Sequence, residues 1–535
     1  MRWIEPGRRR RRRLPRAPAA VLLLLAVGAV AVFLVLRAHD ADRRRMQATA
    51  AQFADAWERG ATQKMWELLG PRARADFPRS RFAAAYRAAN RAATVSAVRV
   101  GRIPEPSHDR VLLPVTMRTR LFGTLRGTVT LPLVRDGERR RIAWTPHLRL
   151  PGLRPGDRVG RRVGASPRRA SVLDAAGRRL DREPATAAIA GRPPSAGGRG
   201  TGLERLYDAR LSGRPSAELR FGRRVIARVP GRRGHSVRAT IRPGLQRAAV
   251  AALGGRLGGV AVIRPRDGAV LALAGLAVSA PQPPGSTFKI VTVAAALQAG
   301  IVKPTSTYPV RTSVTLSGVR LRNAHDEACG GSLTNALTVS CNAVFAPIGA
   351  RLGAKRLARA AERFGFNRVP RVPSAVASRF PAPRELRDSL AVGAAAIGQD
   401  RDLATPLQMA VVGATIANRG VHAAPRIARS EKVVRRRAVR VRVARQVREM
   451  MRSVVRSGTG RAAALPGVDV AGKTGTAELR PTADAASDPK NTDAWFVAFA
   501  PAGKPRVAVA VMLVGAGAGG KSAAPIARQV LQAAL

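Results

Sequence analysis

Apolar positions between residues 46 and 150 follow first a helical period and then the alternation of strands. Four apolar residues of 47–69 lie at helical spacing, namely Phe53, Trp57, Met65 and Leu69. The next runs predict a second helix and four strands, at 79–91, 95–100, 110–117, 127–134 and 141–144. Asp136-Gly137 separates the last two strands, as in a hairpin. These patterns predict a small α+β unit over 46–150.

Regular patterns are sparse in residues 151–235, which are rich in Pro, Gly and Arg. We interpret this region as an extended linker or dimerisation module. From residue 236 regularity returns, with helices predicted at 245–253, 287–298 and 522–535 and strands at 259–263 and 270–274. Helices mixed with a mainly antiparallel sheet over 236–535 indicate an α+β or α/β unit. For the whole chain we expect a multidomain α+β protein.

The first 45 residues indicate attachment to a membrane. Residues 8–13 are all arginine, and 19–36 contain no charged side chain, which is long enough to span a bilayer. Because the basic flank precedes the apolar segment, we expect a cytoplasmic N-terminus and an extracytoplasmic remainder. A cleaved signal peptide is the alternative. The length of the apolar stretch and the lack of a clear small-x-small cleavage site favour an uncleaved single-pass anchor.

Composition and charge do not alter the predicted domain organisation. The net charge is +61, but only nine of the 94 basic residues are lysine, and they are spread along the chain. We interpret the arginine excess as typical of a GC-rich genome, with attraction to anionic wall polymers or lipids as a secondary use. Aromatic residues make up 4%, and no nucleic-acid-binding motif occurs, so no nucleic-acid partner is expected. Two cysteines and six histidines predict neither a metal site nor a cofactor.

A first candidate for chemistry is Ser286, which begins the predicted helix after Pro283-Pro284-Gly285. Lys289 lies one turn further along the same face. A serine hydroxyl is a weak nucleophile until a base takes its proton, and a buried lysine can be that base. By itself the tetrapeptide fits an ordinary helix-capping serine equally well. A second Ser-x-x-Lys match, at 487–490, lies in a polar loop with a proline and is attributed to chance.

Two further motifs change the interpretation of Ser286. Ser340-Cys341-Asn342 lies 54 residues after Ser286, between apolar helical patterns. Lys473-Thr474-Gly475-Thr476 lies 133 residues after Ser340 and follows an apolar run, like the inner edge of a strand. Each motif alone fits an ordinary turn. In this order and at these separations, the three match the penicillin-recognising serine acyltransferases.

The chain therefore resembles the class B penicillin-binding proteins. Similar segments continue beyond the motifs, at 395–399, 404–410, 416–420 and 494–501. The resemblance implies a penicillin-binding, serine β-lactamase-like transpeptidase fold over 236–535. Residues 46–150 resemble the small nuclear-transport-factor-like domain of the methicillin-resistance type, through Phe122-Gly123 and Trp144-Thr145-Pro146.

The middle of the chain resembles the family's linker module through 204–208 and 211–213, with departures elsewhere. Residues 169–177 differ from the usual Arg-Gly-x-Ile-x-Asp-Arg-x-Gly. Asp400 replaces a glycine, and Asp493 stands where a histidine often precedes Ala-Trp-Phe. The three motifs themselves are intact.

What the resemblance implies is a peptidoglycan D,D-transpeptidase that β-lactams acylate. Ser286 would be the nucleophile and Lys289 its base, while Ser340 relays the proton and Asn342 orients substrate and base. The backbone N–H groups of Ser286 and Thr476 would form the oxyanion hole. The four residues of the third motif would bind the substrate's terminal carboxylate: Lys473, Thr474, Gly475 and Thr476. The charge of Lys473 would also keep Lys289 neutral.

Cys329 and Cys341 lie twelve residues apart in the extracytoplasmic part, and Cys341 is inside the second motif. We predict a disulfide bond that braces the rim of the site; two buried free thiols are the alternative.

Other functions share parts of this pattern. A serine β-lactamase carries the same three motifs, but no Glu-x-x-x-Asn box occurs between Ser340 and Lys473. A β-lactam sensor needs a cytoplasmic signalling part, and about 18 residues precede the apolar segment. Intact motifs disfavour a silent scaffold. Expected partners are stem peptides, β-lactams, the membrane and a glycan-polymerising protein, since nothing before residue 236 resembles a glycosyltransferase.

Overall fold

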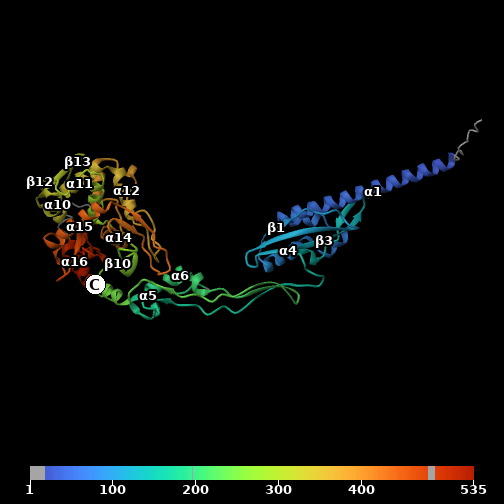
Figure 1. Ribbon diagram of the computed structural model, residues 1–535, viewed down its shortest axis with the longest axis horizontal. Coiled ribbons are helices and arrows are strands. Elements are labelled where there is room, and N and C mark those ends of the chain that lie inside the picture. Colours follow the sequence, from blue (N-terminus) through green and yellow to red (C-terminus); the bar gives the residue numbers. More distant parts are fainter. Residues whose placement is uncertain (1–18, 196, 480–488) are drawn as a thin grey trace, which may run out of the picture. The chain divides into compact units, whose positions relative to one another are not determined.

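The computed structural model describes residues 19–195, 197–479 and 489–535. The basic run 8–13 and the side chains of 19–25 lie outside this part. Among the residues that it does describe, no helix combines the length and the apolar character needed to cross a membrane. The chain divides into two compact units (Figure 1), one of Met1–Pro167 with Arg214–Arg232 and one of Arg168–Gly213 with Arg233–Leu535. Residues 151–235 are therefore shared between the two units.

Among its described residues, the first unit contains four α-helices and a four-stranded antiparallel sheet of order β1-β2-β3-β4. The elements are α1 (Ala19–Glu58), α2 (Thr62–Glu67), α3 (Pro71–Asp76), α4 (Arg79–Ala93), β1 (Val95–Val100), β2 (Arg110–Thr119), β3 (Thr124–Asp136) and β4 (Arg139–Ile142). All four predicted strands and the hairpin at Asp136-Gly137 are confirmed. The prediction of one helix over 47–69 is wrong, because Gly60 takes a left-handed conformation (φ +67°) and separates α1 from α2.

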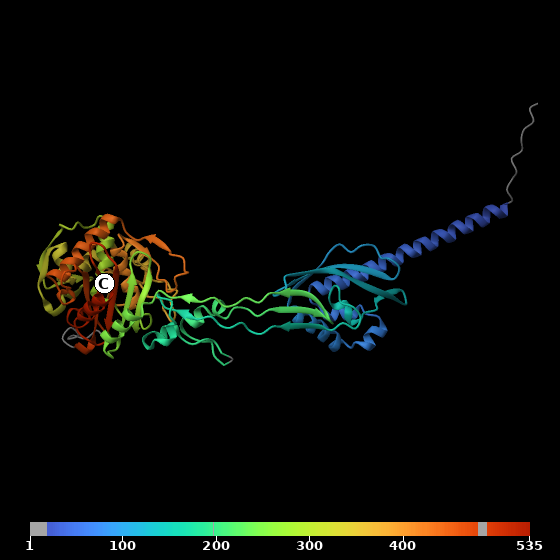
Figure 2. The same ribbon diagram turned by 60° about the horizontal axis from the view of Figure 1, so that its bottom comes forward.

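Large aromatic side chains form the core of this unit. Trp144 lies edge-on to Phe77 and Phe82, and its indole N–H donates to the Tyr86 hydroxyl at 3.2 Å. A separate three-stranded sheet joins chain segments that are far apart in sequence (Figure 2). In it, β7 (Ala217–Phe221) lies between β5 (Val159–Val163) and β8 (Arg224–Val229). The buried side chains of β7 continue the apolar core of this unit.

The second unit is built around a five-stranded antiparallel sheet of order β11-β10-β20-β19-β18. Its strands are β10 (Gly258–Arg264), β11 (Ala269–Gly275), β18 (Ala471–Glu478), β19 (Thr492–Ala500) and β20 (Val507–Leu513). One face packs on α8 (Pro243–Leu253) and α16 (Gly519–Ala534). The other face packs on α14 (Pro406–Ala417), so that every residue of β19 and β20 is buried.

A helical region adjoins the α14 face of the sheet, and its core is continuous with that face. It contains α9 (Lys289–Gln298), α10 (Leu333–Thr338), α11 (Asn342–Leu352), α12 (Ala354–Phe364), α13 (Ser389–Ala396) and α15 (Val441–Arg456). Short strands border it: β12 (Thr307–Arg311), β13 (Ser313–Leu316), β14 (Val319–Arg322), β15 (Cys329–Ser332), β16 (Val421–Ala423) and β17 (Arg435–Arg437). The remaining short elements of the unit are β6 (Val172–Leu173), β9 (Val237–Arg238), α5 (Pro184–Ala190), α6 (Gly202–Leu206) and α7 (Asp208–Ser212).

Candidate active site

Ser286 lies in a 3₁₀ turn, Gly285–Phe288, immediately before α9. Gly285 makes this turn possible, because its φ is +50° and a Cβ there would lie 2.6 Å from the carbonyl oxygen of Thr476. The turn is held by the Gly285 N–H, which donates to Gly398 at 2.9 Å, and by the Thr287 hydroxyl, which donates to Pro284 at 2.7 Å. The Ser286 side chain is half-buried, and its hydroxyl has no hydrogen-bond partner among the described residues.

Lys289 is the first residue of α9 and is fully buried. Its Nζ lies 2.7 Å from the Ser340 carbonyl oxygen, 2.6 Å from Asn342 Oδ1 and 3.4 Å from Ser340 Oγ. Burial lowers the pKa of Lys289 well below its usual value, and the nearby Lys473 lowers this pKa further. The lowered pKa favours the neutral form of the amine.

A neutral amine has two protons and one lone pair. The Ser340 carbonyl and Asn342 Oδ1 can only accept hydrogen bonds, so they take both protons of Lys289. The lone pair is left to accept a proton from a serine hydroxyl. This arrangement is what a general base beside Ser286 requires.

The second motif forms the turn between α10 and α11. Ser332 caps α10 by accepting a hydrogen bond from the Asn335 N–H at 3.1 Å. Ser340 then takes a left-handed conformation (φ +65°), which is uncommon for a residue other than glycine. This conformation brings its carbonyl oxygen and its hydroxyl to the same amine, that of Lys289.

The third motif lies on β18, the edge strand of the five-stranded sheet. Lys473 is opposite Val497 in the register and is fully buried. Its Nζ donates to the Thr474 carbonyl oxygen at 3.0 Å. Burial lowers the pKa of Lys473 to about 7. The Thr474 hydroxyl lies 2.6 Å from the hydroxyl of Thr459, a residue that no motif includes.

Gly475 lets β18 pass directly beside the 3₁₀ turn that carries Ser286. A Cβ at this position would lie 2.8 Å from the Pro284 carbonyl oxygen and 2.9 Å from Thr287 Cγ2. Real Cβ atoms do not approach backbone this closely. Thr476 follows, and its hydroxyl accepts from the Gly519 N–H at 3.4 Å, at the start of α16. The three motifs, dispersed over 191 residues of the sequence, thus lie around one site.

Cys329 and Cys341 form a disulfide bond, with their Cα atoms 5.7 Å apart. It joins β15 to the residue between Ser340 and Asn342. A cavity of about 230 Å³ adjoins it and is lined by Val310, Glu327, Ala328, Cys329, Gly330, Gly331, Asn335 and Val339.

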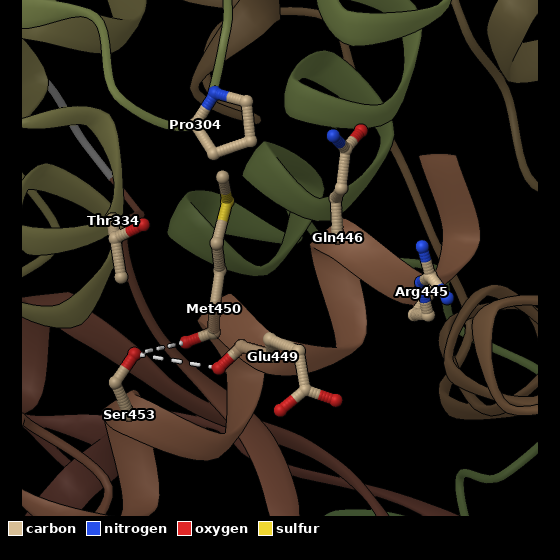
Figure 3. Close-up of a pocket in the computed structure, with 7 residues that line it drawn as sticks. All are labelled: Pro304, Thr334, Arg445, Gln446, Glu449, Met450 and Ser453. Atoms are coloured by element: carbon tan, nitrogen blue, oxygen red, sulfur yellow. Dashed lines mark hydrogen bonds between the residues drawn. The ribbon is translucent and has the colours of Figure 1, made fainter. Parts of the chain in front are cut away.

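A larger cavity, of about 450 Å³, is lined mainly by residues of α15 (Figure 3). Its lining consists of Pro304, Thr334, Arg445, Gln446, Glu449, Met450 and Ser453. Met450 points toward Pro304, and the Ser453 hydroxyl bonds to backbone carbonyls of its own helix, α15. None of these residues belongs to the three motifs, so the cavity adds nothing to the chemistry at Ser286.

Each departure from the family's pattern has a defined place in the structure. Asp400 takes a left-handed conformation (φ +68°), which glycine adopts freely and aspartate tolerates. Asp493 is buried on β19, which raises its pKa to about 6. In the linker, Arg169 pairs with Glu204 at 2.6 Å and Asp208 at 2.5 Å, joining two segments that resemble the family separately.

Sequence reasoning missed two residues of this site. Thr459 contacts Thr474, and Asn323 bonds to the N–H of Ala343 just after the second motif. The only local signal for Thr459 is its position between Gly458 and Gly460, which indicates a turn but not its neighbour. Nothing in the sequence around Asn323 distinguishes it from an ordinary turn residue.

Comparison with known proteins decides the family. The sequence profile described as "Penicillin binding protein transpeptidase domain" matches residues 258–532, half of the chain. This chain belongs to the penicillin-binding protein transpeptidase family. It is 37% identical over 402 residues to the peptidoglycan D,D-transpeptidase PbpA of Mycolicibacterium smegmatis. This match covers 63% of this chain and 79% of that relative. The corresponding identity to PbpA of Mycobacterium tuberculosis is 35%, with the same coverage.

Solved structures agree. Penicillin-binding protein A from M. tuberculosis, as a ceftriaxone acyl-enzyme complex, superposes with a TM-score of 0.59 at 30% identity, over 69% of this chain and 99% of that one. The D,D-transpeptidase domain of a peptidoglycan glycosyltransferase from Eggerthella lenta gives the same TM-score at 28% identity, with the same coverage. The predicted penicillin-binding transpeptidase fold of the C-terminal part is therefore confirmed.

Proposed function

We propose that Ser286 is the nucleophile of this transpeptidase. The enzyme is a serine-type acyltransferase of peptidoglycan, a D,D-transpeptidase that binds β-lactams covalently. The observation that carries the assignment of Ser286 is the buried amine of Lys289, one helical turn away. Both of its protons are bound by carbonyl oxygens, and its pKa is lowered. A lowered pKa and a free lone pair are the properties that a general base needs.

Acylation then proceeds as follows. Lys289 takes the Ser286 proton as the oxygen attacks the carbonyl carbon between two D-alanines of a stem peptide. The backbone N–H groups of Ser286 and Thr476 stabilise the oxyanion. The C–N bond breaks, Ser340 passes the proton to the leaving amine, and the terminal D-alanine departs. The amine of a second stem peptide attacks the ester, restores Ser286 and completes the cross-link.

The third motif supplies the site for the substrate's terminal carboxylate. Lys473 and the hydroxyls of Thr474 and Thr476 are its ligands, and a bound carboxylate favours the protonated form of Lys473. Gly475 between them permits the strand to lie against the nucleophile turn. Asn342 holds Lys289 and contacts the amide of the peptide. A β-lactam presents a similar carbonyl and carboxylate and acylates Ser286 in the same way.

Labelling by a fluorescent penicillin tests the nucleophile. The full-length Ser286→Ala protein should lose covalent labelling completely. Ser487→Ala is the matched control, because Ser487 begins the second Ser-x-x-Lys match of the chain and lies outside the described residues. It should label like the wild type. Stoichiometric labelling of Ser286→Ala, or loss of labelling in Ser487→Ala, contradicts the assignment.

The lifetime of the adduct tests the alternative of β-lactam hydrolysis. A transpeptidase should keep a penicilloyl group for many minutes, because it lacks a residue that directs water at the ester. A β-lactamase releases it within seconds. Release at that rate in wild-type protein contradicts a transpeptidase role.

We also propose an identity for each of the three parts of the chain before residue 236. Residues 46–150 form a nuclear-transport-factor-like domain of the methicillin-resistance type, 151–235 a linker or dimerisation module, and 1–45 a basic tail with a single-pass anchor. The buried aromatic cluster around Trp144 and the ion pairs of Arg169 support the first two. A separate protein would polymerise the glycan. Protease protection of the N-terminus in sealed vesicles tests the orientation.

A further inference from the structure

A buried amide outside the motifs holds the turn that carries Ser340. Asn323 follows β14 and is 6% exposed. Its Nδ2 donates to the carbonyl oxygens of Arg311 and Glu327, each at 2.8 Å, and its Oδ1 accepts from the Ala343 N–H, also at 2.8 Å. Both protons of the amide are used, and its orientation is fixed by its partners. One side chain thus joins the end of β12, the segment just before β15 and the first turn of α11.

The residue before Asn323 acts on the same turn. The Arg322 carbonyl oxygen accepts a hydrogen bond from Asn342 Nδ2 at 3.1 Å. This bond turns the Asn342 amide so that its Oδ1 faces Lys289 Nζ at 2.6 Å. Asn323 Oδ1 also lies 3.9 Å from the sulfur of Cys341. Two consecutive residues therefore contact three consecutive residues of the second motif and its helix.

The turn needs such support because of its backbone. Ser340 is left-handed, a conformation that is strained in a residue other than glycine and persists only where its surroundings impose it. The disulfide fixes one side of the turn at Cys341. Asn323 fixes the helical side, through the N–H of Ala343.

We propose that Asn323 is a positioning residue for acylation. It holds Asn342 and the Ser340 turn so that the two protons of Lys289 stay on carbonyl oxygens and its lone pair faces the serine hydroxyl. This inference rests on the proposed role of Lys289. A displacement of about 1 Å in such a constellation can lower a rate by about a hundredfold.

The test separates the acylation rate constant from the dissociation constant of the penicillin, using full-length protein. Asn323→Ala should lower the rate constant by about tenfold or more, leave the dissociation constant within about threefold, and shift the apparent pKa of the rate profile. The matched control is Asn335→Ala, which removes one side-chain bond, from Nδ2 to the Gly330 carbonyl at 2.9 Å, on the other side of the turn. It should change neither the rate constant nor its pH profile.

Asn323→Asp adds a second, independent readout. The carboxylate still accepts from Ala343 but cannot donate to Arg311 or Glu327, whereas its protonated form regains one donor. The acylation rate constant of this variant should therefore approach that of the wild type as the pH falls from 8 to 5. This pH dependence tests the positioning role of Asn323 even if the alanine variant does not fold.

The outcomes are distinct. Variants of Asn323 that melt earlier but acylate with the wild-type rate constant and pH profile, well below their melting temperature, overturn the positioning role. The positioning role is also overturned if the acylation rate constant of Asn323→Asp, relative to wild type, is the same at every pH. Absence of labelling in the wild type overturns the proposed function instead.

Discussion

The two walls of the site are built in different ways. The wall of β18 is held by a continuous ladder with β19, from Ala471 opposite Phe499 to Glu478 opposite Thr492. The wall of Ser340 is a turn between two helices and has no ladder. There, a disulfide and the side-chain hydrogen bonds of Asn323 and Asn342 supply the rigidity.

This difference determines which changes each wall tolerates. On the β18 wall the critical positions are those without a side chain, Gly475 and Gly285, where two backbones approach. On the Ser340 wall the critical positions are polar side chains with several partners. The first wall should be sensitive to added atoms, and the second to lost hydrogen bonds.

The largest effects are expected from replacing the two buried lysines, Lys289 and Lys473, which should change different constants. Lys289→Met removes the proposed base, whose amine contacts the Ser340 wall, and should lower the acylation rate constant by about a thousandfold or more, with little change in the initial binding of penicillin. Lys473→Met, on the β18 wall, should mainly weaken that binding, because it removes the cation beside the carboxylate. Stopped-flow labelling over a range of penicillin concentrations measures both constants. Equal losses in both constants for the two variants would contradict this division.

Next in size is Gly475→Ala. The added Cβ meets the Pro284 carbonyl oxygen and Trp495 Cβ, at 2.8 and 2.9 Å, so β18 must move away from the nucleophile turn. We expect a loss of about ten- to a hundredfold in acylation, from misplacement of about 1 Å. Gly503→Ala is the control, since nothing lies within 4 Å of a Cβ there. Wild-type acylation by Gly475→Ala would show that the contact between strand and turn is not close in solution.

The sequence predicts the regular parts of the molecule better than the joints between them. The strand runs at 95–100 and 259–263 match β1 and β10 within a residue, because alternation and turn residues are local signals. The predicted helix at 287–298 begins instead with a 3₁₀ turn that contains Ser286, and α9 starts at Lys289. Gly285 needs its conformation because Thr476 lies beside it, a contact that no local pattern encodes.

The same limit applies to the candidate site. The order of the three motifs was enough to select Ser286 over Ser487, although their tetrapeptides fit the pattern equally. The sequence does not predict the left-handed Ser340, the contact between Thr459 and Thr474, or the hydrogen bonds of Asn323. Each depends on segments that meet only in the folded chain, and an asparagine in a turn has many local explanations.

Removal of the disulfide should have a moderate effect on the Ser340 wall. The double variant Cys329→Ser/Cys341→Ser opens a loop of twelve residues, which costs about 3 kcal/mol of stability in the chain-entropy view. Acylation should fall only severalfold, since Asn323 still holds Ala343. Denaturant unfolding and labelling measure the two effects. Wild-type stability of the double variant would indicate that the bond does not form, and a complete loss of acylation would give the disulfide the role assigned to Asn323.

The smallest effect on activity is expected at Asp493, behind the β18 wall. Asp493 is fully buried opposite Ala477, and its Oδ1 accepts from the Gly515 N–H at 3.1 Å. Burial raises its pKa from 3.8 to about 6, so its contribution to stability is present below about pH 4 and is lost as the pH rises through 6. Asparagine keeps the acceptor and does not ionise. The stability of Asp493→Asn relative to wild type should therefore increase between pH 4 and pH 8, by at most about 3 kcal/mol at about 1.4 kcal/mol per pKa unit.

Melting curves at several pH values measure this increase, and labelling at pH 8 serves as the control for the site. Acylation should stay within about twofold of wild type, because the ladder between β18 and β19 holds Lys473 and Gly475 without Asp493. A difference in stability that does not vary with pH would place the carboxyl in water. A large loss of acylation would show that the β18 wall, like the Ser340 wall, depends on a buried polar side chain, and the contrast between the two walls would then fail.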